Sequence, residues 1–224
     1  MVIQRLPAPR EYLAPTYFLD SDSRSLIDYA VSAIGNRVSE VDKGVAVYYA
    51  VRDQVRYNPY ALVLDPAAYR ASAVLQAGEG FCVQKAILLA AAARVVGIPS
   101  RLGFADVRNH LSTEKLRRTL STDVFAFHGY VELFLEGRWV KATPAFNRSL
   151  CERFNAAPLE FNGRNDSIFQ PLDLSGNRYM EYLRFHGEFA DFPFERMVNT
   201  FREVYPHFFA LKAELPKGDF ERED

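Results

Sequence analysis

The spacing of hydrophobic residues divides the chain into a helical part and a part that forms strands. Between residues 21 and 96, apolar side chains recur every three to four positions, which is typical of helices that bury one face. We predict helices that carry Leu26–Ile34, that cover about 41–55 and about 71–76, and that extend over 81–96. The last of these is apolar on nearly every side, so we expect it to be buried.

Beyond Pro99 the hydrophobic period changes to two, as it does in strands. Strands are predicted over residues 100–107, 125–135 and 138–143, with Glu136-Gly137 as the turn of a hairpin between the last two. The charged segment 110–122 should form a surface helix or flap, and a late helix should span about 194–204. Residues 1–19 carry three prolines and are expected to form an extended arm over the core.

No repeat or linker interrupts this order, so we predict one α+β domain over residues 1–224. The 27 basic residues nearly balance the 28 acidic ones, and a net charge of −1 gives no field that attracts nucleic acid or an anionic membrane. Two cysteines cannot supply a disulfide framework. The longest apolar stretch, 86–93, is far shorter than the ~20 residues of a membrane span, and the first residues lack the apolar region of a signal peptide. We therefore expect a soluble, cytoplasmic protein.

Cys82 is the first candidate for chemistry. It lies where the turn Gly78-Glu79-Gly80 enters the buried helix, so free backbone N–H groups and the positive end of the helix dipole converge on its sulfur. Such a position lowers the pKa of a thiol, and the thiolate is the nucleophile. The alternative is that Cys82 is a small buried hydrophobe, as most free cysteines are.

His128 is the second candidate. Strand alternation places it on one face with Tyr130, and pairing across the predicted turn sets Tyr130 opposite Thr143. His128 then lies diagonally from Thr143, at roughly 7–8 Å between Cα atoms, within reach of a side chain. Thr143 is therefore where a residue that orients the His128 ring would be sought, although a lone strand histidine is more often structural.

Together these segments resemble the transglutaminase-like (papain-like) cysteine enzymes, with a bacterial-type transglutaminase core. The resemblance rests on GEGFCVQKAILLAAAARVVGIPSR (78–101) and on HGYVELFLEGRWVKATP (128–144). These segments are similar to the family's Gly-x-Cys helix, its GIP-x-R strand entry and its His-x-x-x-Glu hairpin ending in G-x-W. Asp20 and RDQVRY (52–57) are similar to the family's lead-in. The similarity covers about residues 15–147, and the aromatic-rich extension 148–224 is unmatched.

The resemblance implies a fold and a set of roles. The fold would be papain/transglutaminase-like, with N-terminal helices and a buried Cys-bearing helix packed on an antiparallel sheet. Cys82 would be the nucleophile, His128 its general base and acid, and backbone N–H groups at the Cys82 turn would hold the oxyanion. Gln76, six residues before Cys82, has the spacing of the oxyanion glutamine of papain-like proteases, or is a helix-surface residue. No cofactor and no metal take part in this chemistry.

The chain departs from the family at Thr143, where the third catalytic residue would be an aspartate. A hydroxyl can orient an imidazole, but it cannot stabilise an imidazolium by charge. Three hypotheses follow. Cys82 and His128 act as a thiolate–imidazolium dyad with Thr143 as a neutral orienter; a carboxylate from elsewhere, Asp166 or Asp123, takes its place; or catalysis is lost and a binding cleft remains.

Other residues receive structural interpretations. Cys151 lies outside any motif, and His110, His186 and His207 lack the spacing of metal ligands. Glu132 and Lys141 should form a cross-strand ion pair. A basic cluster in the segment 110–122 either gives this flap a solvated face or gates the cleft. Aromatic residues of the extension should wrap the domain and close one side of the cleft. The cluster is Lys115, Arg117 and Arg118, and the aromatic residues are Phe154, Phe161, Phe169 and Tyr179.

The sequence therefore predicts a cysteine-dependent acyl transfer on a peptide, a protein or a small amide, by way of a Cys82 thioester. Whether water or an amine resolves the thioester, as in a protease or amidase or in a transglutaminase, is left open. The alternative is a catalytically inactive binding module with the same cleft, which Thr143 favours. A surface rich in phenylalanine could also support a homodimer.

Overall fold

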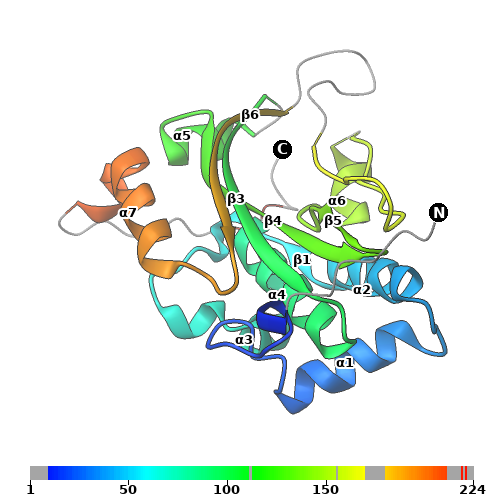
Figure 1. Cartoon of the computed structure of the whole chain (residues 1–224). Coiled ribbons are helices and arrows are strands. Elements are labelled where there is room, and N and C mark those ends of the chain that lie inside the picture. Colours follow the sequence, from blue (N-terminus) through cyan, green and yellow to red (C-terminus); the bar gives the residue numbers. More distant parts are fainter. Residues whose placement is uncertain are drawn as a thin grey trace.

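The computed structural model describes residues 10–110, 113–154, 156–169 and 180–210, together with Gly218 and Phe220. Helices dominate the first hundred residues, and the main sheet follows (Figure 1). The helices are α1 (Arg24–Ile34), α2 (Glu40–Gln54), α3 (Ala71–Ala77), α4 (Cys82–Val95), α5 (Glu114–Leu120), α6 (Arg148–Arg153) and α7 (Phe194–Val204). The strands are β1 (Arg56–Tyr57), β2 (Glu79–Gly80), β3 (Ser100–Asn109), β4 (Val124–Leu135), β5 (Arg138–Ala142) and β6 (Met180–Phe189). Short 3-10 helices are η1 (Arg10–Tyr12), η2 (Pro59–Ala61), η3 (Pro66–Tyr69) and η4 (Pro206–Phe209).

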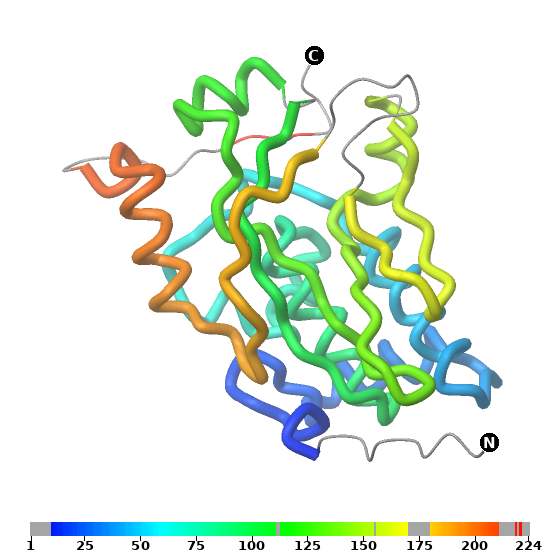
Figure 2. Tube along the Cα trace, turned by 45° about the horizontal axis from the view of Figure 1, so that its top comes forward, coloured from blue at the N-terminus to red at the C-terminus, as the bar shows by residue number. Residues whose placement is uncertain are grey.

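Four strands form an antiparallel sheet in the order β5-β4-β3-β6, and β1 pairs with β2 in a small parallel ladder. Figures 1 and 2 show α1 to α4 gathered on one face of the sheet, with α7 alongside its β6 edge. This arrangement confirms the α+β class and the antiparallel sheet beside a buried helix that the sequence predicts.

The first two long helices begin at serine caps. The Ser23 hydroxyl accepts the N–H of Leu26, and the Ser39 hydroxyl accepts the N–H of Asp42 at 3.0 Å. Each cap satisfies a backbone donor that has no partner inside the helix. The predicted helical segments agree with the observed ones to within a residue or two.

Helix α4 is the centre of the core. Every residue from Cys82 to Arg94 is buried, with α1, α2 and α3 packed around the helix and β4 across it. Lys85 is fully buried, and its Nζ donates to the carbonyl oxygens of Arg52 at 2.9 Å and Val55 at 2.6 Å. The buried ammonium is thus hydrogen-bonded, as burial of a charge requires. Among the described residues, none of the helices is long and apolar enough to cross a membrane.

The β4–β5 hairpin has the predicted register. Leu135 pairs with Arg138, and Glu136 and Gly137 both adopt positive φ, 50° and 84°, as a two-residue turn requires. Glu132 pairs with Lys141, with 4.0 Å between Nζ and the carboxylate, and Arg101 also binds Glu132.

Three elements of the extension were not predicted, namely α6, the edge strand β6 and the 3-10 helix η4. The pairing of β6 with β3 shifts twice, so buried and exposed residues do not alternate along β6. Without this alternation the sequence does not indicate a strand. Residues 10–19 pack on the core, where Tyr12 lies edge-on against Trp139 and the carbonyl of Ala14 accepts a bond from Arg94. They are not the extended arm that was predicted, because η1 and several bends fold this segment.

Candidate active site

Cys82 is the first residue of α4, as predicted. Gly78 ends α3 with a left-handed backbone (φ 67°), and β2 then pairs with β1. The Gln84 side chain turns back to accept the N–H of Phe81 at 3.2 Å, which fixes the start of the helix. Cys82 is therefore held at a well-ordered helix N-terminus, where only 8% of its surface is exposed.

Strand β4 crosses this end of α4 at Gly129. A Cβ at Gly129 would lie 3.0 Å from Val83 Cα and 3.1 Å from the Cys82 carbonyl oxygen, so glycine permits the close approach. The backbone N–H groups of Gly129, Val83 and Cys82 itself act to lower the pKa of the Cys82 thiol. Because His128 directly precedes Gly129, this contact also brings the His128 backbone to the nucleophile end of the helix.

Burial keeps both predicted catalytic groups neutral. It raises the pKa of the Cys82 thiol to about 11, and the three backbone N–H groups oppose this rise without cancelling it. It lowers the pKa of His128 to about 4. At neutral pH the resting site therefore holds a thiol and a neutral imidazole, in place of the thiolate and imidazolium of the first of the three hypotheses.

Thr143 lies directly after β5, one residue beyond the Val131–Ala142 pair, and is almost fully buried. Its N–H donates to the carbonyl of Ser167 at 2.9 Å, and its own carbonyl accepts the Tyr48 hydroxyl at 3.1 Å. Among the described residues, neither Thr143 Oγ1 nor His128 Nε2 has a hydrogen-bond partner. The Thr143 hydroxyl thus does not hold the imidazole in this conformation.

Tyr182, on β6, brings a further buried hydroxyl to Thr143. Burial raises the pKa of Tyr182 to about 12, while the Phe169 backbone and the Thr143 side chain act to lower it and a charged Cys82 would raise it. The hydroxyl nevertheless makes no well-formed hydrogen bond within the described chain. The Phe169 ring also lies 5.3 Å from the His128 ring. Sequence analysis did not single out Tyr182, because nothing in the extension showed that β6 joins the sheet beside the site.

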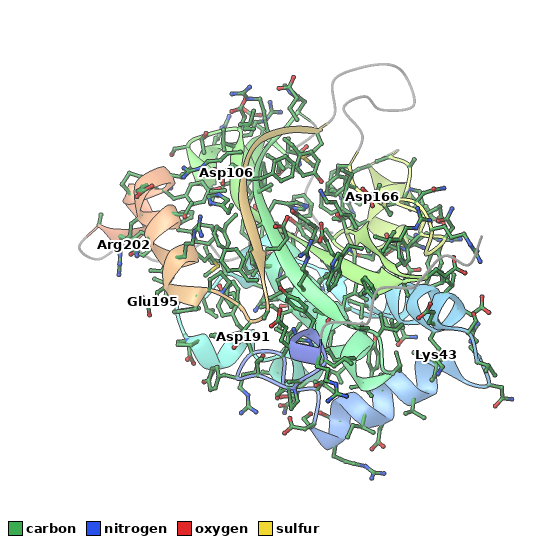
Figure 3. The ribbon with its side chains drawn as sticks, in the orientation of Figure 1. Lys43, Asp106, Asp166, Asp191, Glu195 and Arg202 are labelled. Atoms are coloured by element: carbon green, nitrogen blue, oxygen red, sulfur yellow. The ribbon has the colours of Figure 1, made fainter. Side chains whose placement is uncertain are left out.

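The two carboxylates considered as substitutes are engaged elsewhere. Asp166 is exposed and accepts the N–H of Lys141 at 2.9 Å, and Asp123 pairs with Arg108 at 3.1 Å on the surface. Within the described chain, no hydrogen bond or ion pair joins either carboxylate to His128. Figure 3 shows Asp166 on the β5 side of the sheet, opposite the side that carries Asp106.

Asp106 is a partly buried carboxylate that was not predicted from the sequence. Its Oδ1 accepts the N–H of Phe127 at 2.9 Å and lies 2.7 Å from His186 Nε2. Phe127 has a positive φ of 59° within β4 and immediately precedes His128. A charged residue in the otherwise apolar run from Leu102 to Val107 was the available signal.

An apolar cavity of about 50 Å³ reaches the Cys82 side chain. It lies between the first turn of α4, the flap helix α5, strand β4 and the C-terminal elements α7 and η4. Its apolar lining residues include Leu116, Leu120, Phe125, Ala126, Phe201 and Phe208. The flap thus covers Cys82 with its apolar face, while Lys115, Arg117 and Arg118 are exposed.

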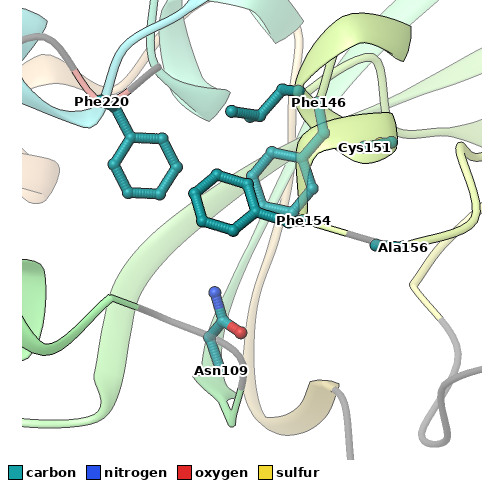
Figure 4. A pocket seen from close by; sticks show the side chains of 7 residues that line it. Asn109, Phe146, Cys151, Phe154, Ala156 and Phe220 are labelled. Carbon is teal, nitrogen blue, oxygen red and sulfur yellow. The ribbon is translucent and has the colours of Figure 1, made fainter. Parts of the chain in front are cut away.

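A second apolar cavity, of about 30 Å³, lies at Cys151 in α6 and is shown in Figure 4. Phe146, Phe154 and Phe220 line it, and the Phe154 and Phe220 rings stack at 5.3 Å. Burial raises the pKa of Cys151 to about 11. Cys151 has no histidine among the described lining residues, in keeping with its predicted structural role.

Gln76 is not among the described residues that line the cavity at Cys82. It is exposed on α3 and lines a surface hollow together with Asp20 and Arg70. Neither Cys82 nor His128 is among the described residues of that hollow. The role of Gln76 as an oxyanion donor stays a prediction.

The remaining predicted residues have structural contacts. No group of three or more His, Cys, Asp or Glu residues suited to a metal ion occurs in the described chain. His207 bonds the carbonyl of Thr119, and Phe161 packs against Tyr48. Tyr179 lies outside the described residues.

Comparison with known proteins identifies the family. A family model for the transglutaminase-like superfamily matches residues 27–144, more than half of the chain, and includes Cys82, His128 and Thr143. No significant match was found among curated proteins.

Similar solved structures have low sequence identity to this chain. A proposed cysteine protease from Cytophaga hutchinsonii is 16% identical, with a TM-score of 0.47 over 79% of this chain and 52% of the other. An arylamine N-acetyltransferase from Mycobacterium abscessus is 15% identical, with a TM-score of 0.40 over 59% and 46%. The chain thus spans about half the length of these proteins.

Proposed function

The chain belongs to the transglutaminase-like superfamily, and on that premise we propose that it is a cysteine-dependent acyl-transfer enzyme. The observation that carries the proposal is the position of Cys82 at the start of α4, where backbone N–H donors have no partner inside the helix and where Gly129, the residue after His128, packs closely. Such donors stabilise negative charge on sulfur or on a developing oxyanion. The substrate is a peptide, a protein or a small amide.

In the first step the Cys82 sulfur attacks the carbonyl carbon, and the thiol proton passes to His128. The tetrahedral oxyanion that forms is held by backbone N–H groups at the start of α4. The carbon–nitrogen bond then breaks, the imidazolium gives its proton to the departing amine, and a thioester remains on Cys82. Water or a second amine attacks the thioester, giving an acid or a new amide and returning the proton to the thiol.

Removing Cys82 tests this proposal. The protein is incubated with p-nitrophenyl acetate, and acetyl transfer is followed by intact mass spectrometry and peptide mapping. We expect acetylation at Cys82 that Cys82→Ala abolishes and that His128→Ala slows by at least about 100-fold. Cys151→Ala is the matched control, because it removes the other buried thiol and should leave the rate unchanged. Acetylation that persists in Cys82→Ala, or no acetylation at all, would overturn the proposal.

A second candidate is a binding module that retains the cleft without catalysis. The neutral state of Cys82 and His128, and the absence of a carboxylate at Thr143, favour it. In that case Cys82→Ala should retain full ligand affinity, and no acyl-enzyme should form with any ester.

A further inference from the structure

The cavity at Cys82 has a chemical character that bears on the substrate. Among the described residues that line it there is no charged side chain, and Leu116, Leu120, Phe201 and Phe208 are among its apolar lining residues. The hydroxyl of Tyr205, another lining residue, is already bonded to the backbone of Ala126 and Val124. A group that enters the cavity therefore meets carbon and few free polar atoms.

The size of the cavity limits the group that fits. A volume of about 50 Å³ corresponds to roughly three or four methyl-sized groups. A carboxylate, an ammonium or a primary amide placed there would lose its hydration without gaining partners, which is costly. A short hydrocarbon would instead gain from burial.

The position of the cavity connects it with the reaction. The Cys82 side chain is part of its wall, so an acyl group carried on sulfur has this cavity beside it. The wall is built from several separate parts of the chain: the segment 57–62, the start of α4, the flap helix α5, the edge of β4 at Phe125 and Ala126, and the extension at α7 and η4. The last of these lies outside the family match at 27–144.

Resting on the proposed function, we propose that Cys82 accepts short, uncharged, apolar acyl groups, of about two to four carbon atoms, which the cavity under α5 holds. The sulfur attacks the carbonyl carbon of the donor, the bond to the leaving group breaks, and the leaving group departs with the proton held by His128. The alkyl part of the acyl group then lies against Leu116 and Leu120.

The test compares p-nitrophenyl esters of acetate, butyrate, octanoate and monosuccinate by the rate at which each acylates Cys82. Butyrate and monosuccinate have chains of equal length and differ by one carboxylate. We expect butyrate to react at least about 30-fold faster than monosuccinate, because the carboxylate cannot be desolvated in the cavity. We also expect octanoate to be slow, because its chain is longer than a cavity of about 50 Å³ can hold. Equal rates for butyrate and monosuccinate would overturn the inference while leaving the proposed function intact.

Two variants locate the selectivity in the cavity. Leu116→Ala removes a wall residue and should shift the preference from butyrate toward octanoate by about tenfold. Leu120→Ala provides the same test if the first variant does not fold. Lys115→Ala, on the exposed side of α5, is the control and should keep the wild-type order of rates. An unchanged order in both leucine variants would contradict the assignment, and failure of every ester to acylate wild-type Cys82 would instead overturn the proposed function.

Discussion

The carboxylate of Asp106 holds the backbone of Phe127 in a left-handed conformation, directly before His128. Asp106 Oδ1 accepts the Phe127 N–H at 2.9 Å, and the φ of Phe127 is 59°. A bulky residue seldom adopts positive φ inside a strand, and such strain persists only where the surroundings impose it. The surroundings of Phe127 impose this conformation, because its ring also packs between two other rings. The ring centroids lie 4.4 Å away for Phe104 and 4.9 Å away for His186.

The same carboxylate joins two bulges. Between the pairs Ala105–His128 and Val107–Phe125, strand β4 has one residue more than β3. Strand β6 likewise has an extra residue, His186, opposite the step from Phe104 to Ala105. A bulge reverses the face on which later side chains lie. Asp106 therefore helps to determine where His128 points.

We predict that Asp106→Ala slows acylation of Cys82 by about tenfold or more, because a small displacement of His128 impairs proton transfer. It should also lower the free energy of unfolding by about 2 kcal/mol, since the Phe127 N–H loses its partner in a buried place. Asp106→Asn keeps an acceptor oxygen and should retain most of the acylation rate. The measurements are acylation rates well below the melting temperature and urea unfolding.

Asp123→Ala is the matched control, because Asp123 pairs with Arg108 at the surface of the same sheet. Asp123→Ala should change neither the rate of Cys82 acylation nor the free energy of unfolding appreciably. If Asp106→Ala lowered stability alone and kept the rate of Cys82 acylation, Asp106 would be a structural residue without a positioning role.

A carboxylate at position 143 should raise the pKa of His128 and the rate at which Cys82 is acylated. In Thr143→Asp the new charge lies diagonally across the hairpin from His128, whose Nε2 has no partner within the described chain. We expect the pKa of His128 to rise and acylation of Cys82 to accelerate by at least about tenfold. NMR titration of the His128 ring and acylation rates measure the two effects. Thr143→Asn has nearly the same shape without the charge, and an equal acceleration in it would refute the electrostatic explanation.

The fold could be predicted where one periodicity continued long enough to be recognised. Helix α4 shows this best, because its apolar surface and the following Gly97 and Pro99 define both its burial and its end. The β4–β5 hairpin was equally accessible, since Glu136-Gly137 fixes the register. Strand β6 was not, because its two shifts against β3 destroy the alternation on which the prediction depends.

The residues of the candidate site also differ in whether the sequence could predict them. Cys82 and His128 stand in local motifs, so their positions follow from the sequence. Tyr182 and His186 approach the site only because β6 adds to the sheet from about fifty residues further along the chain. The protonation of Cys82 depends on its burial, to which residues of α5 and α7 at the adjoining cavity contribute. No local sequence pattern around Cys82 indicates that these distant helices pack there.

The thiol of Cys82 should react as a neutral, buried group. With its pKa raised to about 11, the rate of alkylation by iodoacetamide should increase by about tenfold per pH unit from pH 6 to 10. A Cys151→Ala background leaves Cys82 as the only thiol. A rate that levels off below pH 8, and that loses this plateau in His128→Ala, would instead show a thiolate paired with imidazolium in the resting protein.

Burial of His128 should also make the fold sensitive to acid. Its pKa falls from the ordinary 6.5 to about 4 on folding, so between these values the unfolded chain binds more protons than the folded one. The free energy of unfolding should therefore decrease as pH falls through this window, by about 3 kcal/mol in total from this group. His128→Gln should remove that part of the decrease when urea unfolding at pH 7.5 is compared with pH 4.5. His207→Gln, which alters a surface histidine, should leave the wild-type decrease unchanged, and an equal decrease in His128→Gln would mean that His128 is charged in the folded protein.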